Sequence, residues 1–408
     1  MMTETATRVP DHVPAPLVID YDYFNDERYQ RFGGIPEAMA GLRREAPDVF
    51  WSTKLGGYWV IQGYAAVVDA ANRPDVFTST SMTIPRGPRL AAFKRPAPLM
   101  YDPPEHTALR RPLSMAFSPK AMAQRSGTVR ALAVELIDTI VPLGACDFFE
   151  AVAEPLPVLI FMEIMGLDKA HFREFRRLAQ AIVSEADPLK RAEAGNTVSL
   201  KMQALIKERR AEPRDDLVSK LIRTEIEGRP LNDDELAGYC TLLFAAGLDS
   251  VANGMGFCVR YLAHDQALQQ RLRDEPKILP FAIEELLRRH APAPVCRMVT
   301  QDIVWQGVTM KEGDMVLLHY PGANLDDAAF PDAATVSLGR ERINHLAFGS
   351  GPHRCAGRHL ARIEIQVMLE ELFRRLPTFR PDPDKAEAMH GGSVMSMDHL
   401  PLVWSLAG

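Results

Sequence analysis

The sequence is poor in cysteine: its 408 residues include only five, at positions 146, 240, 258, 296 and 355. No two form a C-x-x-C pair, and an odd number fits poorly with a disulfide framework, so we expect a reducing compartment. Long hydrophobic runs are also missing, because stretches such as "CTLLFAAGL" fall far short of the roughly 20 residues that span a bilayer. The N-terminus lacks the basic and apolar regions of a signal peptide. We therefore expect a soluble, cytoplasmic protein with no membrane partner.

An excess of positive charge is absent as well, since the formal net charge is -6. This balance argues against nucleic acid as a partner, because nucleic-acid-binding domains usually carry a basic surface. Internal repeats, low-complexity tracts and charge-blocked linkers are missing too. The composition is otherwise that of an ordinary globular protein, with 47% hydrophobic and 25% charged residues. We interpret residues 1–408 as one large domain with a loose tail over about residues 1–16.

The apolar residues of the sequence are spaced mainly with the helical period, and this pattern is nearly continuous from residue 118 to about residue 274. A long helix is predicted from Asn232, a capping residue with Glu235 in the first turn, to about His264. The other expected elements are helices at 64–77, 276–290 and 357–375, strands at 58–63, 297–319 and 400–404, and a long loop at 78–102. The pattern predicts a mainly α protein (α+β) with a small β region.

One cysteine has an unusual setting, within the stretch "FGSGPHRCAGR". The glycines permit close backbone approach or positive φ, and Cys355 stands where the last long helix begins. Helix amide dipoles, together with Arg354 and Arg358, are expected to favour the thiolate. Three interpretations are open at this point: a buried structural thiol, a zinc ligand with His353 and His359, and a catalytic nucleophile.

None of these three interpretations accounts for the whole run F-G-x-G-x-x-x-C-x-G. Structural zinc needs four ligands with paired spacing, and no second Cys or His pair stands in a suitable place. A nucleophile needs a base that a third group orients, and His353 alone is weak evidence for one. A lone buried cysteine would not require the surrounding glycines and phenylalanine.

The run resembles the haem-binding loop of the cytochrome P450 family, the haem-thiolate monooxygenases. The resemblance implies haem b with the Cys355 thiolate as axial iron ligand, pushing electron density onto the iron, and dioxygen as co-substrate. Phe348 would pack near the sulfur, while Gly349 and the other loop glycines would let backbone amides point at it. No flavin or nicotinamide fingerprint follows any strand, so no flavin is expected in this chain.

A second motif of that family lies in "EELLRR", which contains Glu285 and Arg288. Their i, i+3 spacing places both side chains on one face of a helix. Alone, the pair would be interpreted as a surface ion pair worth under about 1 kcal/mol. The resemblance adds Arg340, in "SLGRERINHLAFG", as the third member of a network that holds the cysteine loop in place.

A third motif, "AAGLDSVAN", lies within the predicted long helix and matches the family's oxygen-activation pattern. Glycine inside a helix costs about 1 kcal/mol relative to alanine, so Gly247 needs a reason. The resemblance implies that Gly247 lets the helix open for dioxygen, that Ser250 hydrogen-bonds the activated oxygen, and that Asp249 relays protons. The family usually has threonine where Ser250 stands. Serine lacks the methyl group that restricts the rotamer, which bears on how well oxygen use is coupled to product.

Basic residues elsewhere match the positions that bind haem propionates. His106 and Arg110 are four residues apart in "DPPEHTALRR", and Arg297 and His353 match two further propionate positions. A charge-assisted contact from such groups to a carboxylate is strong. Any one of them alone would be interpreted as a solvated surface residue.

Nearly the full chain resembles the bacterial camphor-hydroxylase subgroup. Four apolar residues align with substrate-lining positions: Leu242, Ala245, Ala293 and Val394. The long loop carries Phe93 and Lys94 where that subgroup's camphor enzyme has a tyrosine for the substrate ketone. The resemblance therefore implies a small hydrophobic substrate, a terpenoid or norisoprenoid, rather than camphor itself.

The resemblance also implies an electron donor, a two-iron two-sulfur ferredoxin with its NAD(P)H-dependent reductase, and a monomeric protein. The residues expected to form a basic docking face behind the cysteine are Arg110, Arg111, Arg354, Arg358 and Arg362. Alternatives are a haem-thiolate sensor or carrier without turnover, a peroxide-driven peroxygenase, and a helical protein without haem. The Asp249–Ser250 pair favours oxygen activation.

Overall fold

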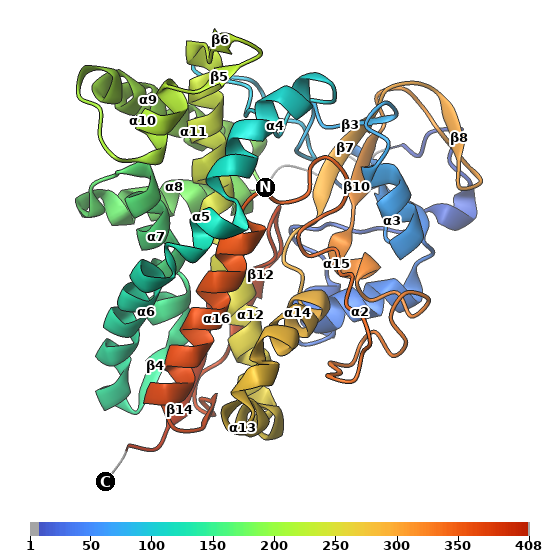
Figure 1. Ribbon diagram of the computed structural model, residues 1–408. Helices are drawn as coiled ribbons and strands as arrows, with labels where there is room; N and C mark the ends of the chain where they lie inside the picture. Colours follow the sequence, from blue (N-terminus) through green and yellow to red (C-terminus); the bar gives the residue numbers. More distant parts are fainter. Residues whose placement is uncertain (1–7, 407–408) are drawn as a thin grey trace.

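The structure is a computed structural model that describes residues 8–406. It places a helix-rich part beside a smaller part in which the largest sheet lies (Figure 1). The helices are α1 (Arg28–Arg31), α2 (Ile35–Glu45), α3 (Tyr64–Ala71), α4 (Glu105–Ala116), α5 (Pro119–Ala123), α6 (Ser126–Ile140), α7 (Pro155–Met165), α8 (Phe172–Ser184), α9 (Pro188–Ala211), α10 (Leu217–Ile222), α11 (Asp233–Gly247), α12 (Asp249–His264), α13 (Gln266–Asp274), α14 (Leu279–Arg289), α15 (Tyr320–Ala323) and α16 (Arg358–Arg375). The prediction of a mainly α protein with small sheets is therefore confirmed.

The strands form several small sheets, of which the largest has the order β1-β2-β10-β7-β3. Those strands are β1 (Val49–Ser52), β2 (Tyr58–Ile61), β3 (Phe77–Thr78), β7 (Val295–Val299) and β10 (Met315–Leu318). A second sheet joins β4 (Ala145–Asp147), β11 (Phe379–Pro381) and β14 (Pro401–Trp404). The remaining strands pair as hairpins: β5 (Glu225–Ile226) with β6 (Arg229–Pro230), β8 (Ile303–Trp305) with β9 (Val308–Met310), and β12 (Ala388–His390) with β13 (Ser396–His399).

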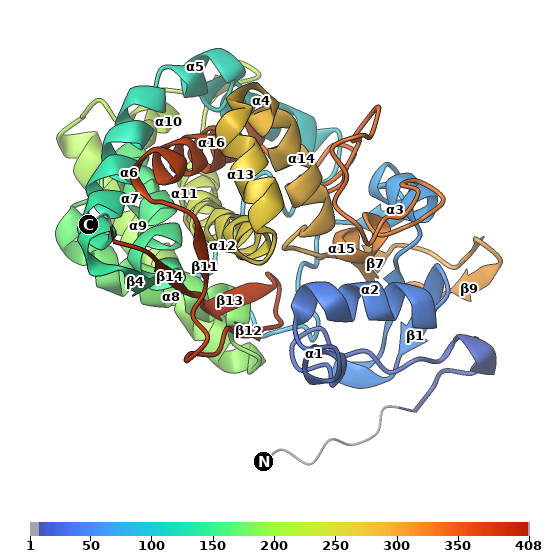
Figure 2. The same ribbon diagram turned by 90° about the horizontal axis from the view of Figure 1, so that it is seen from below.

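Helices α11 and α12 cross the middle of the helix-rich part. The start of α11 is set by a capping box, in which the Asn232 side chain accepts from the Glu235 N–H and the Glu235 carboxylate accepts from the Asn232 N–H. The segment 233–264 is long and apolar enough to cross a membrane, but 67% of its most apolar window is buried by the rest of the protein. It contacts α7, α14, α16 and β13, and the view from below shows α12 between α16 and the β12–β13 hairpin (Figure 2). This burial is typical of the core helix of a soluble protein.

Several predicted elements are confirmed and others need correction. The strands at 58–63, 297–319 and 400–404 are present, and the last helix begins within one residue of its predicted start. The predicted single helix over 232–264 is interrupted at Leu248, so it consists of α11 and α12. The predicted helix 64–77 ends at Ala71, ahead of Pro74, because the residue before a proline disfavours the helical region.

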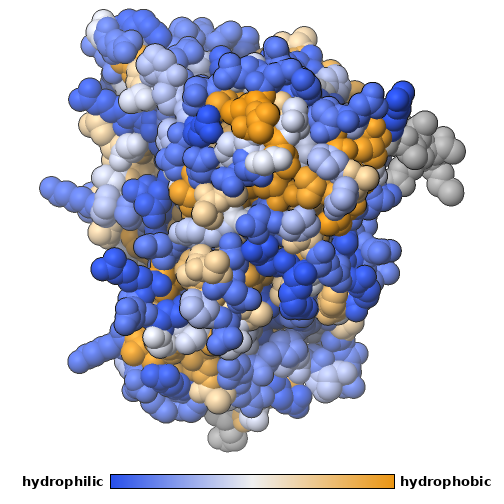
Figure 3. Space-filling view, turned by 90° about the vertical axis from the view of Figure 1, so that its right-hand side faces the viewer, coloured by the Kyte–Doolittle hydropathy of each residue, from blue (hydrophilic) through white to orange (hydrophobic). Residues whose placement is uncertain are grey.

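The expectation of a loose N-terminal tail is wrong for residues 8–16, and residues 1–7 lie outside the described part. Val13 is buried in a hydrophobic cluster with β1 and β2, and the His12 ring lies 3.1 Å from the Asp314 carboxylate. Apolar contact to the sheet therefore holds this segment. The face of the molecule on that side is mainly hydrophilic, with separate hydrophobic patches (Figure 3).

Candidate active site

The cysteine loop is a tight turn that delivers Cys355 to the start of α16. The Cys355 N–H donates to the carbonyl of Phe348 at 2.8 Å, which closes the loop. Gly349 and Gly351 have φ of +70° and +68°, a region that favours glycine. A Cβ at Gly351 would come within 2.3 Å of the Ala71 carbonyl oxygen, so this loop can pack on α3 only with glycine there.

The electrostatics at the sulfur differ in part from the sequence prediction. Desolvation is the largest effect and raises the pKa of the Cys355 thiol, although the residue as a whole is exposed to solvent. The N–H groups of Gly357 and Arg358 and the charges of Arg110 and Arg358 lower the pKa, but they do not outweigh desolvation. Arg354, which the sequence suggested as a further contributor, is not among these main effects. A bound metal cation would reverse this balance, because it deprotonates a coordinating thiol.

The structure brings Glu285, Arg288 and Arg340 together in a buried network. Arg288 donates to both Glu285 carboxylate oxygens at 2.8 Å, and Arg340 donates to Glu285 Oε1 at 2.9 Å. The side chains of Glu285 and Arg288 are 0% exposed, so the surface ion pair considered from the E-x-x-R motif alone is not what forms. Hydrogen bonds from both arginines outweigh desolvation, which would raise the pKa of Glu285, and leave that pKa below its usual value.

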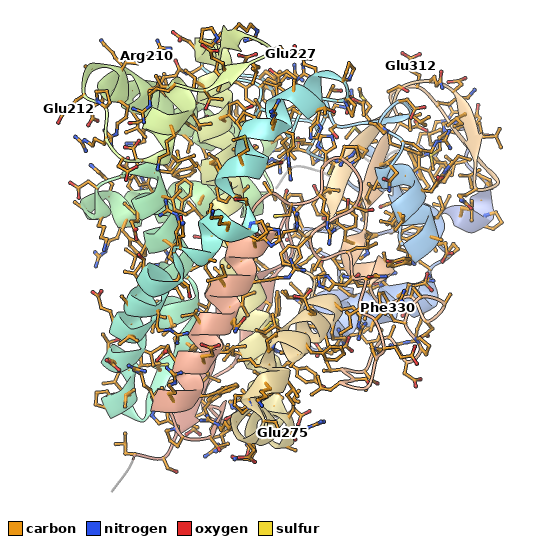
Figure 4. All side chains as sticks on the ribbon, viewed as in Figure 1. Arg210, Glu212, Glu227, Glu275, Glu312 and Phe330 are labelled. Carbon is orange, nitrogen blue, oxygen red and sulfur yellow. The ribbon has the colours of Figure 1, made fainter. Side chains whose placement is uncertain are left out.

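The same network fixes the chain segment that leads to the cysteine loop. Arg288 also donates to the carbonyls of Asn324 and Ala333, at 2.8 and 2.7 Å. Its guanidinium lies 5.2 Å from the ring centre of Phe330, which is labelled in Figure 4 together with charged side chains at the molecular rim. Asn324 in turn accepts from the N–H of Leu346, two residues before Phe348. The position of the cysteine loop therefore depends on α14.

A cluster of basic groups lies next to the loop, and no ion pair joins it to an acidic side chain within residues 8–406. His106 and Arg110 come from α4, Arg297 from β7 and His353 from the loop, and the rings of His106 and His353 are 4.2 Å apart. Burial, then the charge of Arg110, lowers the pKa of His106 to about 4. Burial, then the charges of Arg297, His106 and Arg110, lowers the pKa of His353 to about 2.

Three ring nitrogens of this cluster are buried without a hydrogen-bond partner among the described residues: both of His106, and Nδ1 of His353. Asp102 is the one acidic group that acts on His106, and its carboxylate already accepts from Thr78 and Ser79. Buried polar groups normally have partners, so a ligand with anionic acceptor oxygens fits here. The propionates of haem have this chemistry, and Cys355 lies beside the cluster, since Arg110 donates to the carbonyl of Arg354.

The break between α11 and α12 shapes the second half of the site. The Ser250 hydroxyl donates to the Ala246 carbonyl at 3.3 Å, across Leu248. A Cβ at Gly247 would lie 3.0 Å from the Phe161 ring, so glycine permits the close packing of α11 on α7. Asp249 has one buried carboxylate oxygen, Oδ2, with no partner among the described residues. Desolvation raises the pKa of Asp249 to about 6, where a carboxyl group can exchange protons near neutral pH.

Two of the four predicted pocket residues lie on segments that touch. The hairpin turn that holds Val394 is bonded to the segment that holds Ala293, because the Met395 N–H donates to the Pro292 carbonyl at 2.6 Å. Leu242 and Ala245 share a face of α11, being three residues apart. A surface depression of about 340 Å³, lined by residues such as Tyr64 and Arg342, contains none of the four.

The five predicted docking arginines differ in whether their side chains already form hydrogen bonds or ion pairs within the protein. Arg111 and Arg354 are exposed. Arg110 donates to the Arg354 carbonyl, and Arg358 donates to the Cys355 carbonyl at 3.0 Å. Arg362 forms a bidentate pair with Glu284, at 2.6 and 2.7 Å, and its guanidinium lies 4.3 Å from the ring centre of Phe348.

The sequence analysis did not identify two residues that form important contacts in the site, Glu284 and Asn253. Desolvation would raise the pKa of Glu284, but hydrogen bonds from Arg362 and His345 lower it to about 2. Glu284 adjoins Glu285 in the sequence, yet nothing in the spacing links it to Arg362. Asn253 was missed as well, although it lies in the third motif. Its side chain donates to the Asp249 carbonyl at 2.9 Å and joins α12 to the β12–β13 hairpin.

Comparison with known proteins agrees with this fold and site. The family model "Cytochrome P450" matches residues 152–399. The chain is 33% identical to "Probable cytochrome P450 127A1" of Sinorhizobium fredii, covering 97% of both chains. It is 31% identical to "Steroid C26-monooxygenase" of Mycobacterium tuberculosis, over 84% of this chain and 93% of that protein. It is 33% identical to "Methyl-branched lipid omega-hydroxylase" of Mycobacterium bovis, over 90% of both.

A solved structure of CYP101J2 superposes with a TM-score of 0.88 at 32% identity, covering 98% of this chain and all of that one. CYP101C1 matches almost as well, with a TM-score of 0.87 at 32% identity, covering 98% and 100% of the two chains. The chain therefore belongs to the cytochrome P450 family. It is an oxidoreductase, a P450 monooxygenase, and the family uses haem b with a cysteine thiolate ligand and dioxygen.

Proposed function

We propose that this protein is a ferredoxin-dependent monooxygenase that hydroxylates a small hydrophobic substrate, a terpenoid or norisoprenoid, with Cys355 as the axial ligand of its haem. One C–H bond, one dioxygen, two electrons and two protons yield one hydroxylated product and one water. The observation that carries the proposal is that Cys355 lies beside a basic cluster whose buried imidazole nitrogens have no hydrogen-bond partner among the described residues. When bound, the haem supplies the redox chemistry that splits dioxygen.

The chain's own residues would serve this reaction in distinct ways. His106, Arg110, Arg297 and His353 would orient the haem through its propionates. Ser250 would hold a hydroxyl toward the oxygen, and Asp249, with a pKa raised to about 6 by desolvation, would carry protons to it. Glu285, Arg288 and Arg340 would hold the loop that carries Cys355. We further propose that the whole chain is one domain, monomeric and cytoplasmic.

The substrate class rests on the likeness to the CYP101 structures and on the apolar side chains of Leu242, Ala245, Ala293 and Val394. The names of two relatives point instead to larger substrates, a steroid and a methyl-branched lipid. A titration of the purified protein with terpenoids, norisoprenoids, steroids and branched fatty acids separates these classes. The expected result is a Soret shift with the first two, as water leaves the iron. A shift only with steroids or branched lipids would replace the proposed substrate class.

The proposed ligand has a direct spectroscopic test. The reduced protein under carbon monoxide is expected to absorb at about 450 nm because of the axial thiolate. Cys355→Ser should remove this band, since serine cannot supply a thiolate, while Cys146→Ser in β4 should keep it. A colourless wild-type protein, or a band that survives Cys355→Ser, would refute the role of Cys355.

The docking face is tested by charge reversal at its two exposed members. Arg111→Glu with Arg354→Glu is expected to slow reduction by a ferredoxin about tenfold at low salt, because opposite charges steer association. Arg358 is avoided since it supports the Cys355 carbonyl. The control is Arg380→Glu in β11, which follows the far end of α16. Stopped-flow reduction would contradict the docking model if the double variant matched the control.

A further inference from the structure

The β12–β13 hairpin places a histidine–aspartate pair beside the helix that carries Asp249. His390 Nδ1 lies 2.8 and 2.9 Å from the two carboxylate oxygens of Asp398. The two side chains are 31% and 33% exposed, so the pair can exchange protons with solvent. An imidazole is suited to this exchange because its two ring nitrogens can accept and donate a proton.

The hairpin is attached directly to α12, one turn from Asp249. The Asn253 side chain donates to the Asp249 carbonyl at 2.9 Å and to the Ser396 hydroxyl at 3.4 Å. It also accepts from the Met397 N–H at 2.7 Å. Ser396 is the residue directly opposite His390 in the hairpin register. Asn253 therefore fixes the distance between the Asp249 end of α12 and His390.

Three polar atoms near this junction are buried and have no partner among the described residues. They are Asp249 Oδ2, His390 Nε2 and Glu154 Oε2. The other oxygen of Glu154 accepts from Arg176. After desolvation, the charges of His390, Glu154 and Asp398 and a hydrogen bond from Ser396 act on Asp249, in that order, so all of these groups lie within electrostatic range of it. Ordered water is the usual partner of buried polar atoms that no protein group satisfies.

We propose that the His390–Asp398 pair is the outer end of a proton path, in which water bridges His390 Nε2 and Asp249 Oδ2. The proposal rests on the proposed monooxygenase function. After Asp249 gives a proton to the oxygen chemistry, protonated His390 passes its Nε2 proton through the water to Asp249 Oδ2. His390 is then neutral, with Nδ1–H still donating to Asp398, and Nε2 regains a proton from solvent when the part-exposed ring turns outward. No electron moves in this step.

The path assigns different parts to the two groups. His390 supplies the proton, and Asp398 is a positioning residue that holds the imidazole with Nε2 toward Asp249. Glu154 and Arg176 form an ion pair of their own. The exposed His399 offers a matched comparison. It is in the same hairpin, its Nδ1 lies 2.6 Å from Asp147, and its side chain is 60% exposed.

The test compares His390→Gln, Asp398→Asn and His399→Gln in the haem-loaded protein. His390→Gln is expected to lower product formation about tenfold and to raise the solvent isotope effect on turnover, because water must then reload Asp249 unaided. Asp398→Asn should give a smaller loss in the same direction. Peroxide released per NADH should rise in both variants. The carbon monoxide spectrum, substrate affinity and melting temperature should match the wild type.

Two outcomes would overturn the path: wild-type turnover and isotope effect in His390→Gln, or an equal loss in His399→Gln. If His390→Gln lowers the melting temperature, the isotope effect of Asp398→Asn decides, and a wild-type value there overturns the path. Failure of the proposed monooxygenase function can be told apart from failure of the proton path. In the former case the wild-type protein itself would lack the band at about 450 nm or form no product with reduced ferredoxin.

Discussion

Arg288→Ala is expected to lower the free energy of unfolding by about 3–5 kcal/mol, because it leaves the buried Glu285 carboxylate short of its main partner. Arg340 would still donate to Oε1, but Oε2 would lose the hydrogen bond that Arg288 donates to it. The carbonyls of Asn324 and Ala333 would lose their donor as well. Urea unfolding followed by circular dichroism measures the loss, and the haem content of the purified variant reports the cysteine loop.

The control for this prediction is Arg271→Ala on α13. Arg271 pairs with Glu275 at i, i+4, but both side chains are 53% exposed, so its removal should cost under about 1 kcal/mol. Arg288→Lys should fail to restore stability, because an ammonium group cannot reproduce the bidentate contact and the carbonyl contacts together. Equal stability of the Arg288 and Arg271 variants would contradict a structural role for the network.

Asp249→Asn is expected to reduce turnover about 100-fold, a typical loss when a proton-transferring group is removed. Asparagine keeps the shape of the side chain and the backbone bond to Asn253, but it cannot carry a proton between solvent and the oxygen. Substrate affinity should change little, since Asp249 is not among the apolar residues that we propose to line the substrate pocket. Product formation and substrate-induced Soret shifts, measured on the same preparation, check both statements.

Two further variants sharpen that test. Asp274→Asn at the exposed end of α13 changes the charge equally and should keep wild-type turnover. Ser250→Thr adds the methyl group that restricts the hydroxyl rotamer and should lower the peroxide released per NADH. Wild-type turnover in Asp249→Asn, or the same loss in Asp274→Asn, would refute the relay.

The parts of the site that sequence reasoning located are those that local chain geometry defines. Glu285 and Arg288 are three residues apart on α14, so their contact follows from the helix repeat. The glycines before Cys355 predict a turn, and Gly349 and Gly351 do have positive φ in the structure. The break at Leu248 was missed because the apolar pattern continues through it, and Leu248 keeps right-handed helical dihedrals.

The sequence by itself determined the family, the cysteine loop, the adjacent Asp249 and Ser250, and the mainly helical fold. Each of these depends on a short motif or on the periodicity of residues close together in the chain. Only the tertiary structure decided which distant groups face them. Glu284 meets Arg362 across 78 positions, and Asn253 meets Met397 across 144. Such contacts depend on how buried helices and hairpins pack, and packing sets both the pKa of Asp249 and the solvent path to it, which residue spacing cannot encode.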